Sequence, residues 1–353
     1  MIISSCSSTS FKDIFGGEDD IKKRNDELMK DFSVNKDVLK KFQVDSAKTV
    51  VLSEQVDKEN KPQLTPTSKK KSHNHKRTGT LPQKPTLMAK KKRKSIALQA
   101  YPEGFPEKLK GFDEKSALFW HKYKPFIFPG EKSILEVSYM GISTGSIIVE
   151  TKENTLMDNR EVYHIQTKLK TSSYYSYLYQ VNDLGDSYLT KDEFLPLKFS
   201  LIQRQSSQDI DDLQLFDRQK LKAYSFYKRV TKDKEKKKQK EYSIPRFYQD
   251  PFSSLYFLRG LPMIIGKQYE IPIVNKGKVE LLSATIKSKE TLETKIGKKE
   301  AFKVLVHTKH SGETIKGGYM NFWFSADERR IFLKFDAKIK IGKVTGEITS
   351  YSK

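Results

Sequence analysis

Apolar and polar residues alternate in short runs through the last two-thirds of this 353-residue chain. A period of two places successive side chains on opposite faces of a strand, so each run predicts a half-buried β-strand. Turn residues separate the runs, as in Met140-Gly141, Asp158-Asn159 and Asn275-Lys276-Gly277. About fourteen such strands predict a mostly β, antiparallel, barrel- or roll-like domain. The runs are Ile134–Tyr139, Ser146–Lys152, Val162–Leu169, Tyr174–Val181, Leu197–Gln203, Leu213–Asp217, Leu221–Val230, Tyr269–Val274, Val279–Lys287, Thr291–Ile296, Phe302–Thr308, Tyr319–Phe324, Ile331–Ile339 and Val344–Tyr351.

One short helix is predicted to interrupt the strands. Asp250 suits an N-cap, and Pro251 suits the first helical position, where no backbone N–H is needed. Gly260 is expected to end the helix in the left-handed conformation. The apolar residues between them form one stripe, which should plug an open end of the sheet or pack between two half-domains.

The first hundred residues have a different composition. Residues 1–100 hold four of the 40 aromatic residues, and residues 60–94 hold twelve basic residues and no acidic one. Such a segment buries too little apolar surface to offset the entropy of ordering, so residues 1–100 are expected to be a disordered, Lys-rich tail. Within it, apolar residues between 21 and 42 recur at roughly helical spacing. They predict either marginal amphipathic helices that dock on something or a fraying segment.

Three regions follow from these contrasts. Residues 1–100 are the tail, residues 101–128 a lead-in segment, and residues 129–353 the β-rich domain. That domain is expected to have two halves, 129–230 and 250–353. The highly charged run Lys228–Glu241 between them is predicted to be a solvated hairpin tip or inserted loop.

The N-terminus carries a lipidation-like motif. Ile3-Ser4-Ser5-Cys6 resembles a bacterial lipobox, with two small residues before the cysteine that would receive lipid, and Cys6 is the sole cysteine. No apolar signal core precedes it, so the expectation is that the natural start lies upstream; the alternative is an ordinary free cysteine. A diacylated Cys6 would anchor the chain on the periplasmic side of the outer membrane. An unlipidated chain would be cytoplasmic.

Several motifs in residues 129–353 resemble one known family. They are Pro129-Gly130-Glu131, the stretch 137–145, Thr171-Ser172-Ser173 with 178–183, the stretch 250–259, and 322–330. Together they resemble the bacterial envelope family catalogued as domain of unknown function 3108. The resemblance implies an exported, mostly β protein of Gram-negative bacteria with a barrel-like fold and no established enzymatic activity.

Residues within these motifs have structural and functional interpretations. Arg259, at the predicted helix end, is expected to pair with a carboxylate such as Asp183 or Asp327. The alternative is that the charged and aromatic residues of the motifs line a pocket. The candidates are Tyr179, Asp183, Asp250, Tyr256, Arg259 and Trp323.

Motifs for catalysis and cofactors are missing from the sequence. There is no Gly-x-Ser-x-Gly elbow, and no Walker or Rossmann glycine pattern. His73 and His75 lie close together without a third ligand nearby, and the lone cysteine excludes a Cys-based metal site. We therefore expect no cofactor, no metal and no enzyme. A hydrolase stays an alternative that would require Asp, His and Ser or Tyr to converge in one cleft.

Aromatic and basic clusters suggest partners. The runs 174–179 and 319–324 place Tyr, Phe and Trp on alternate faces, which indicates either a filled core or a barrel cavity for an apolar ligand. The basic cluster Lys90, Lys91, Lys92, Arg93 and Lys94 predicts polyanion contact, and the whole chain carries a net charge of +22. In an envelope lipoprotein the partner would be lipid or an anionic envelope polymer. In a cytosolic protein it would be nucleic acid, which is the alternative function.

Overall fold

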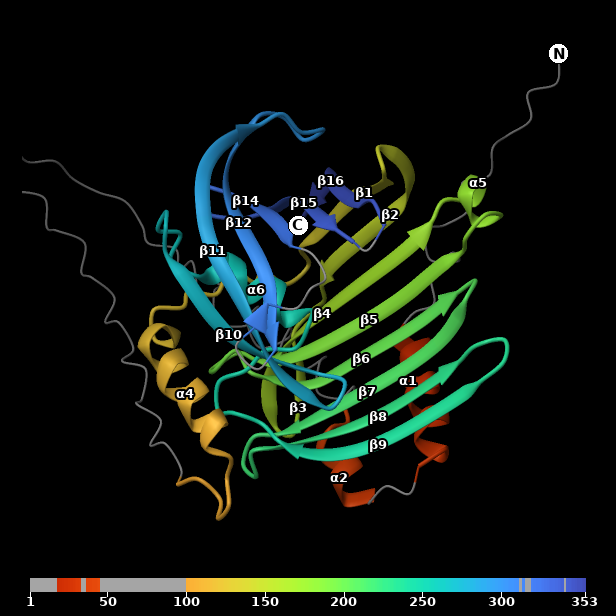
Figure 1. Cartoon of the computed structure of the whole chain (residues 1–353), viewed down its shortest axis with the longest axis vertical. Helices are drawn as coiled ribbons and strands as arrows, with labels where there is room; N and C mark the ends of the chain where they lie inside the picture. Colours follow the sequence, from red (N-terminus) through yellow and green to blue (C-terminus); the bar gives the residue numbers. More distant parts are fainter. Residues whose placement is uncertain (1–17, 33–35, 45–99, 311–312, 315–318, 340) are drawn as a thin grey trace, which may run out of the picture.

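A single antiparallel sheet of 16 strands dominates the computed structural model, which describes residues 18–32, 36–44, 100–310, 313–314, 319–339 and 341–353 (Figure 1). The strands follow the order β10-β11-β12-β14-β15-β16-β1-β2-β4-β5-β6-β7-β8-β9, with β13 paired to β12 and β3 paired to β4. Their bounds are β1 (Lys132–Tyr139), β2 (Ile142–Thr151), β3 (Thr155–Met157), β4 (Arg160–Thr171), β5 (Val181–Thr190), β6 (Pro196–Gln205), β7 (Gln208–Asp217), β8 (Lys222–Val230), β9 (Glu235–Ser243), β10 (Gln268–Asn275), β11 (Lys278–Leu292), β12 (Lys299–His310), β13 (Glu313–Thr314), β14 (Met320–Ser325), β15 (Phe332–Lys338) and β16 (Lys343–Ser352).

The predicted mostly β, barrel-like fold is confirmed. The last strand, β16, pairs with the first, β1, so the two predicted halves form one continuous sheet that curls around a shared core (Figure 1). Two predicted strands are wrong. Tyr174–Val181 is a turn containing α5 (Ser173–Ser176), and β11 ends at Leu292 before a turn over most of Thr291–Ile296.

The predicted helix is present as α6 (Ser253–Gly260), and it lies against the inner face of the sheet. Seven of its eight residues are buried, and Phe257 and Leu258 join the largest core cluster. The expectation for Gly260 is wrong, because its φ is not positive. A glycine is needed there for another reason: a Cβ atom would lie 2.2 Å from the Tyr123 ring and 2.5 Å from the Lys124 carbonyl oxygen.

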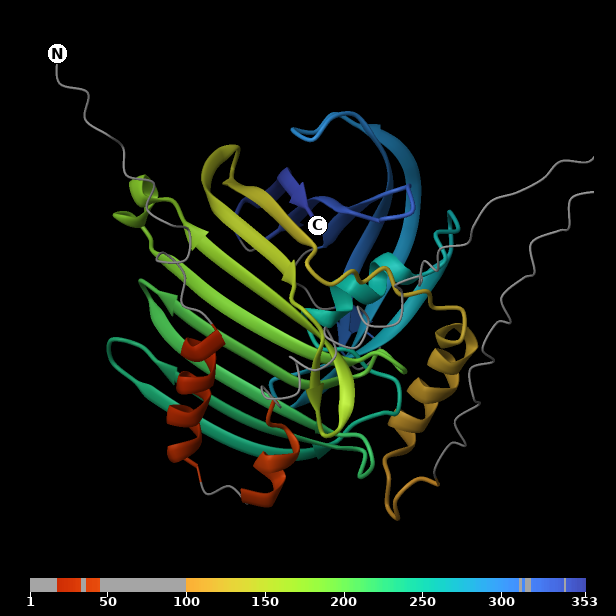
Figure 2. The same cartoon turned by 180° about the vertical axis from the view of Figure 1, so that it is seen from behind.

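Two helices from the predicted tail pack on the outer face of the sheet. Figure 2 shows α1 (Glu18–Lys30) and α2 (Lys36–Lys41) lying across the strands of the β4–β9 region. Leu28 and Phe42 form a cluster with Leu213, Leu215 and Phe226 of β7 and β8. For residues 21–42 the sequence predicts either docked amphipathic helices or a fraying segment. The structure has docked helices, and they pack on this chain's own sheet.

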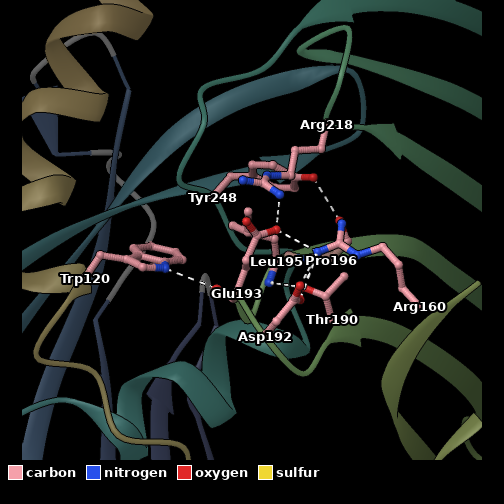
Figure 3. A network of polar contacts seen from close by, with 9 residues as sticks. All are labelled: Trp120, Arg160, Thr190, Asp192, Glu193, Leu195, Pro196, Arg218 and Tyr248. Atoms are coloured by element: carbon pink, nitrogen blue, oxygen red, sulfur yellow. Dashed lines mark hydrogen bonds and ion pairs between the residues drawn. The ribbon is translucent and has the colours of Figure 1, made fainter. Parts of the chain in front are cut away.

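A polar clamp holds the lead-in segment to the sheet (Figure 3). Residues 101–128 contain α4 (Glu107–Trp120), and the Trp120 indole donates to the Glu193 carbonyl oxygen at 3.2 Å. The buried Glu193 carboxylate accepts from Arg160 at 2.7 Å and also from Arg218. Asp192 adds a second carboxylate to Arg160 at 2.8 Å. The clamp thus joins α4, β4 and the β7–β8 turn to the β5–β6 turn.

Of the two interpretations of the charged run 228–241, a hairpin tip or an inserted loop, the structure has a hairpin, and most of the run lies in its paired strands. The residues of the run complete β8 and make up most of β9, and β9 pairs with β8 from Lys222↔Ser243 to Val230↔Glu235. The pairing has a physical reason. β8 alternates apolar and polar residues, and the backbone N–H and C=O groups along its edge away from β7 can hydrogen-bond to a strand whose side chains are mostly polar. Lysines on such an edge strand also oppose pairing with another chain.

Among the described residues, no helix combines the length and the apolar character needed to cross a bilayer.

Candidate anion-binding groove

A groove of about 320 Å³ lies between the β8–β9 hairpin and the β10–β11 turn. Six basic side chains line it, and Ser225, Tyr227 and Gly277 complete its walls. The basic residues are Arg229, Lys236, Lys238, Lys240, Lys276 and Lys278.

Strand alternation sorts the lysines of β9 onto two faces. Lys236, Lys238 and Lys240 point into the groove, whereas Lys237 lies on the opposite face, where its ammonium group bonds Asp31 at 2.9 Å. On the same outer face, Lys228 bonds Asp31 at 2.7 Å. The outward cations are therefore neutralised by the segment after α1, and the inward cations are left to the groove.

The far wall is the tight turn between β10 and β11. Lys276 and Gly277 both have positive φ, +48° and +74°, which suits a two-residue hairpin turn. The Lys240 ammonium group donates to the Gly277 carbonyl oxygen at 2.7 Å and so ties the turn to β9. Lys276 lies 5.8 Å from the centre of the Tyr227 ring.

Most of the positive charge in the groove is not neutralised by an ion pair. In the part of the chain that the structure describes, none of Arg229, Lys236, Lys238, Lys276 and Lys278 forms an ion pair. Cations gathered in a concave surface raise the local concentration of anions and bind them through charge-assisted hydrogen bonds. The groove is therefore suited to an anionic ligand with phosphate or carboxylate groups.

Asp212 lies in the sheet behind the groove wall, next to Tyr227 in the β7–β8 register. Its side chain is buried, and one carboxylate oxygen has no hydrogen-bond partner among the described residues. Burial raises the pKa of Asp212 to about 7, although the charge of Lys276 and a hydrogen bond from Gln214 oppose the shift. Asp212 is thus a negative charge beside the groove that is lost just below neutral pH.

We expect anion binding in the groove to strengthen as the pH falls from about 8 to about 6. Below a pKa of about 7 Asp212 is neutral, and removing one nearby negative charge should raise affinity about 3- to 10-fold. Calorimetric titration with an inorganic anion at several pH values measures this effect. Asp212→Asn should remove the pH dependence and keep the high affinity. An unchanged profile in the variant would assign the effect to another group.

The same pKa shift predicts how stability depends on pH. The folded pKa of Asp212 lies above its unfolded value of about 3.8, so the folded state retains a proton that the unfolded state loses. Stability from this group is present below about pH 4 and is lost as the pH rises towards 7. Chemical unfolding of Asp212→Asn should therefore show its greatest gain over the natural chain above pH 7.

Asp250 occupies the predicted capping position. Its carboxylate accepts hydrogen bonds from the backbone N–H groups of Phe252 and Ser253, both at 2.8 Å. The Ser253 hydroxyl accepts in return from the Asp250 N–H at 2.9 Å, which is the reciprocal arrangement of a capping box. Burial raises the pKa of Asp250 to about 6, opposed mainly by a hydrogen bond from Ser187.

Arg259 pairs with neither predicted carboxylate. Its guanidinium bonds both oxygens of Glu131, at 2.5 and 3.0 Å, and both side chains are buried. Asp183 instead accepts from Gln203 and Gln205, each at 2.8 Å, and Asp327 accepts from the Ser325 hydroxyl at 2.7 Å. Pairing with a carboxylate is confirmed, but the two named partners are wrong, because Glu131 lies 128 residues away in sequence and reaches α6 only after β1 joins the sheet.

The other predicted pocket residues do not meet in one place. Tyr256 accepts from the Thr151 hydroxyl at 2.9 Å within the core. The indole of Trp323 on β14 donates to Glu290 at 2.6 Å. Tyr179 lies at the exposed β4–β5 turn, where its hydroxyl contacts Ser207 at 2.7 Å. Asp250, Tyr256 and Arg259 share α6 or its cap, whereas Tyr179, Asp183 and Trp323 make their contacts on other strands and turns, so a shared pocket stays a prediction.

The remaining predicted sites lie outside the described residues. These are Cys6, the cluster Lys90, Lys91, Lys92, Arg93 and Lys94, and the pair His73 and His75. Among the residues that the structure does describe, no group of three or more His, Cys, Asp or Glu side chains is placed to hold a metal ion.

Sequence reasoning missed the groove. Its signal was present in the alternation of residues 235–242, where every second residue from Lys236 to Lys240 is lysine. Treating the whole run as a solvated loop concealed this period. The contribution of Lys276 and Lys278 required the sheet topology, because the sequence does not place the β10–β11 turn beside β9.

Comparison with known proteins gives one family match and three distant folds. The family model described as "Protein of unknown function (DUF3108)" matches residues 135–349. No curated protein matches the chain. A β-barrel-like DUF1849 protein from Brucella abortus is 10% identical with a TM-score of 0.42, over 63% of this chain and 96% of that one.

Two further solved structures resemble the chain at lower TM-scores. One, from Bacteroides fragilis, is described as a candidate exported protein with a YmcC-like fold; it is 13% identical with a TM-score of 0.32, over 65% of this chain and 100% of its own. The other is a candidate lipoprotein from Parabacteroides distasonis, 12% identical with a TM-score of 0.31, over 65% and 99%.

Proposed function

This chain belongs to the DUF3108 family of proteins of unknown function, and from that premise we propose that it is a non-enzymatic binding protein of the bacterial cell envelope. Its ligand is an anionic envelope component that carries phosphate or carboxylate groups, and the binding site is the groove between the β8–β9 hairpin and the β10–β11 turn. The observation that carries this proposal is the set of five groove cations that form no ion pair within the described residues.

The choice of an anionic ligand over an apolar one follows from where the aromatic residues lie. Phe324 and Trp323 are buried in the core, and Phe322 packs against it. Tyr174 and Tyr177, by contrast, lie on an exposed turn. The aromatic runs thus fill the core or face solvent, whereas the groove described here is lined by basic side chains.

The envelope location is supported by the N-terminal motif and by the family resemblance. Diacylation of Cys6 would hold the chain at a membrane, where anionic lipid and polymer are abundant. Fractionation of cells that make the full-length natural protein tests this part. Recovery in the membrane fraction with a lipid-modified Cys6 supports it. An unmodified protein in the cytosol would leave polyanion binding by the basic cluster at residues 90–94 as the alternative function.

Binding itself is tested on the purified full chain. Inorganic tripolyphosphate and citrate serve as phosphate and carboxylate probes, and maltotriose serves as a neutral probe of similar size. We expect saturable calorimetric binding of at least one anion, weakening as salt is added, and none of maltotriose. Absence of saturable binding to both anions would overturn the groove as a ligand site, whatever the location of the protein.

A further inference from the structure

Exposed apolar side chains gather on three neighbouring turns at one end of the sheet. Nine large apolar residues in the described part of the chain are more than half exposed, and six of them lie on these turns. The six, which we name the apolar rim, are Met140, Ile142, Tyr174, Tyr177, Leu178 and Ile341. Exposed apolar patches on one side of a soluble domain indicate a contact surface.

Backbone contacts make the rim continuous. The Met140 N–H donates to the Lys343 carbonyl oxygen at 2.9 Å, which joins the β1–β2 turn to the β15–β16 turn. On the other side, the Ser172 N–H donates to the Thr144 carbonyl oxygen at 2.9 Å, which joins the α5 turn to β2. Figure 1 shows α5 and the β1–β2 tip projecting on the same side of the molecule.

The α5 turn is the most prominent part of the rim. Tyr174, Tyr177 and Leu178 are 77%, 91% and 80% exposed, and none of the four residues of α5 is buried. The turn is ordered by backbone hydrogen bonds, such as Ser176 N–H to the Ser172 carbonyl oxygen at 2.9 Å. A short ordered turn that holds aromatic side chains out in water has no role in the core of this domain.

Charge on the rim turns is positive. Asp336, just outside them, pairs with Lys343 at 3.1 Å, which leaves Lys338 as the exposed rim lysine that forms no ion pair in the described residues. The three turn segments, residues 139–145, 171–181 and 337–346, contain no Asp or Glu, but they contain lysine at positions 338, 340 and 343. The side chains of Lys338 and Lys343 are exposed. Tyrosine favours the boundary between headgroups and acyl chains, and nearby lysines attract anionic headgroups. The composition therefore complements an anionic lipid surface.

We propose that the apolar rim is a membrane-contacting surface, by which the folded domain itself inserts Tyr177, Leu178 and their neighbours into the interface of an anionic bilayer. This contact is separate from lipid anchoring at Cys6 and does not require the groove to hold a ligand. It places the β-rich domain directly on the membrane with its hairpin turns facing the lipid.

Vesicle binding of the full, unacylated chain tests the proposal. The vesicles are equimolar phosphatidylcholine and phosphatidylglycerol, and the assay is sedimentation at about 0.15 M salt and again at about 1 M salt, where the Debye length of about 3 Å suppresses binding by charge alone. The test variant is Tyr177→Ser with Leu178→Ser. Its matched control is Ile264→Ser with Ile265→Ser, which removes two exposed apolar side chains away from the rim.

We expect the rim variant to lower the partition constant at least about tenfold and the control to change it less than twofold. Lipids with brominated acyl chains should quench the fluorescence of the tryptophan introduced by Tyr177→Trp. They should not quench that of the tryptophan introduced by Ile265→Trp. Circular dichroism checks that all variants fold. Equal partitioning of the two double variants, or no vesicle binding by the unaltered chain, would overturn the proposal. So would rim-dependent dimerisation without vesicle binding, because the occupant would then be a second copy.

Discussion

Lys236→Glu combined with Lys238→Glu is expected to weaken tripolyphosphate binding by about 100-fold. Each substitution replaces an attraction with a repulsion across a solvent-exposed groove, and the two together should cost about 2–3 kcal/mol of binding free energy. Both side chains are exposed and point from an edge strand, so stability should change by no more than about 0.5 kcal/mol. Calorimetric titration at low salt measures the affinity, and urea unfolding confirms the fold.

The matched control is Lys287→Glu with Lys298→Glu. Both residues are exposed and lie away from the groove lining, and the pair changes the net charge by the same amount. We expect this control to weaken binding less than about threefold, through the long-range field alone. If both pairs weakened binding equally, the ligand would be held by net charge or by the basic tail, and the groove would have no special role.

Arg259→Met is expected to lower the free energy of unfolding by about 3–5 kcal/mol. The substitution leaves the Glu131 carboxylate buried without its cation, and a buried charge that loses its partner is strongly destabilising. It also removes the hydrogen bond from the guanidinium to the Arg329 carbonyl oxygen at 2.6 Å. Arg259 thereby joins α6, the residue before β1 and the β14–β15 turn, so the loss affects the core beside the pairing of β1 with β16.

Three comparison variants make this prediction specific. Arg259→Lys keeps the charge but loses the paired geometry, and should cost about 1–3 kcal/mol. Adding Glu131→Gln to Arg259→Met removes the uncompensated charge and should recover a large part of the loss. Ser288→Ala, at a half-exposed position on β11, should be nearly neutral. An Arg259→Met cost below about 1 kcal/mol would contradict the prediction that this buried ion pair holds the core together.

The local sequence pattern was sufficient to predict a feature wherever the interacting residues are close together in the sequence. Most strands follow from alternation because a strand with one buried face requires it. The capping role of Asp250 follows from the Asp-Pro pair because the cap and the amides it binds are at most three residues apart. The same logic failed at Tyr174–Val181, where alternating tyrosines lie on an exposed turn and make no buried face.

The candidate site could be predicted only in part, because its two walls come from different regions of the chain. Lys236, Lys238 and Lys240 follow from strand periodicity once β9 is accepted as a strand. Their outward neighbour Lys237 is neutralised by Asp31, 206 residues away, and Lys276 lies beside Tyr227 across the β10–β11 turn. These contacts depend on which segments the folded sheet brings side by side. A local sequence pattern does not contain that information.

By itself, the sequence determined the β-rich class of the domain, the position of its central helix and the cap that starts that helix, since each depends on interactions between residues that are close along the chain. Only the tertiary structure decided that Glu131 is the partner of Arg259, that α1 and α2 pack on the outer face of the sheet, and that six cations share one groove. The physical reason is that burial and charge compensation depend on which distant segments meet, and a sheet of 16 strands brings them together through pairings such as β1 with β16.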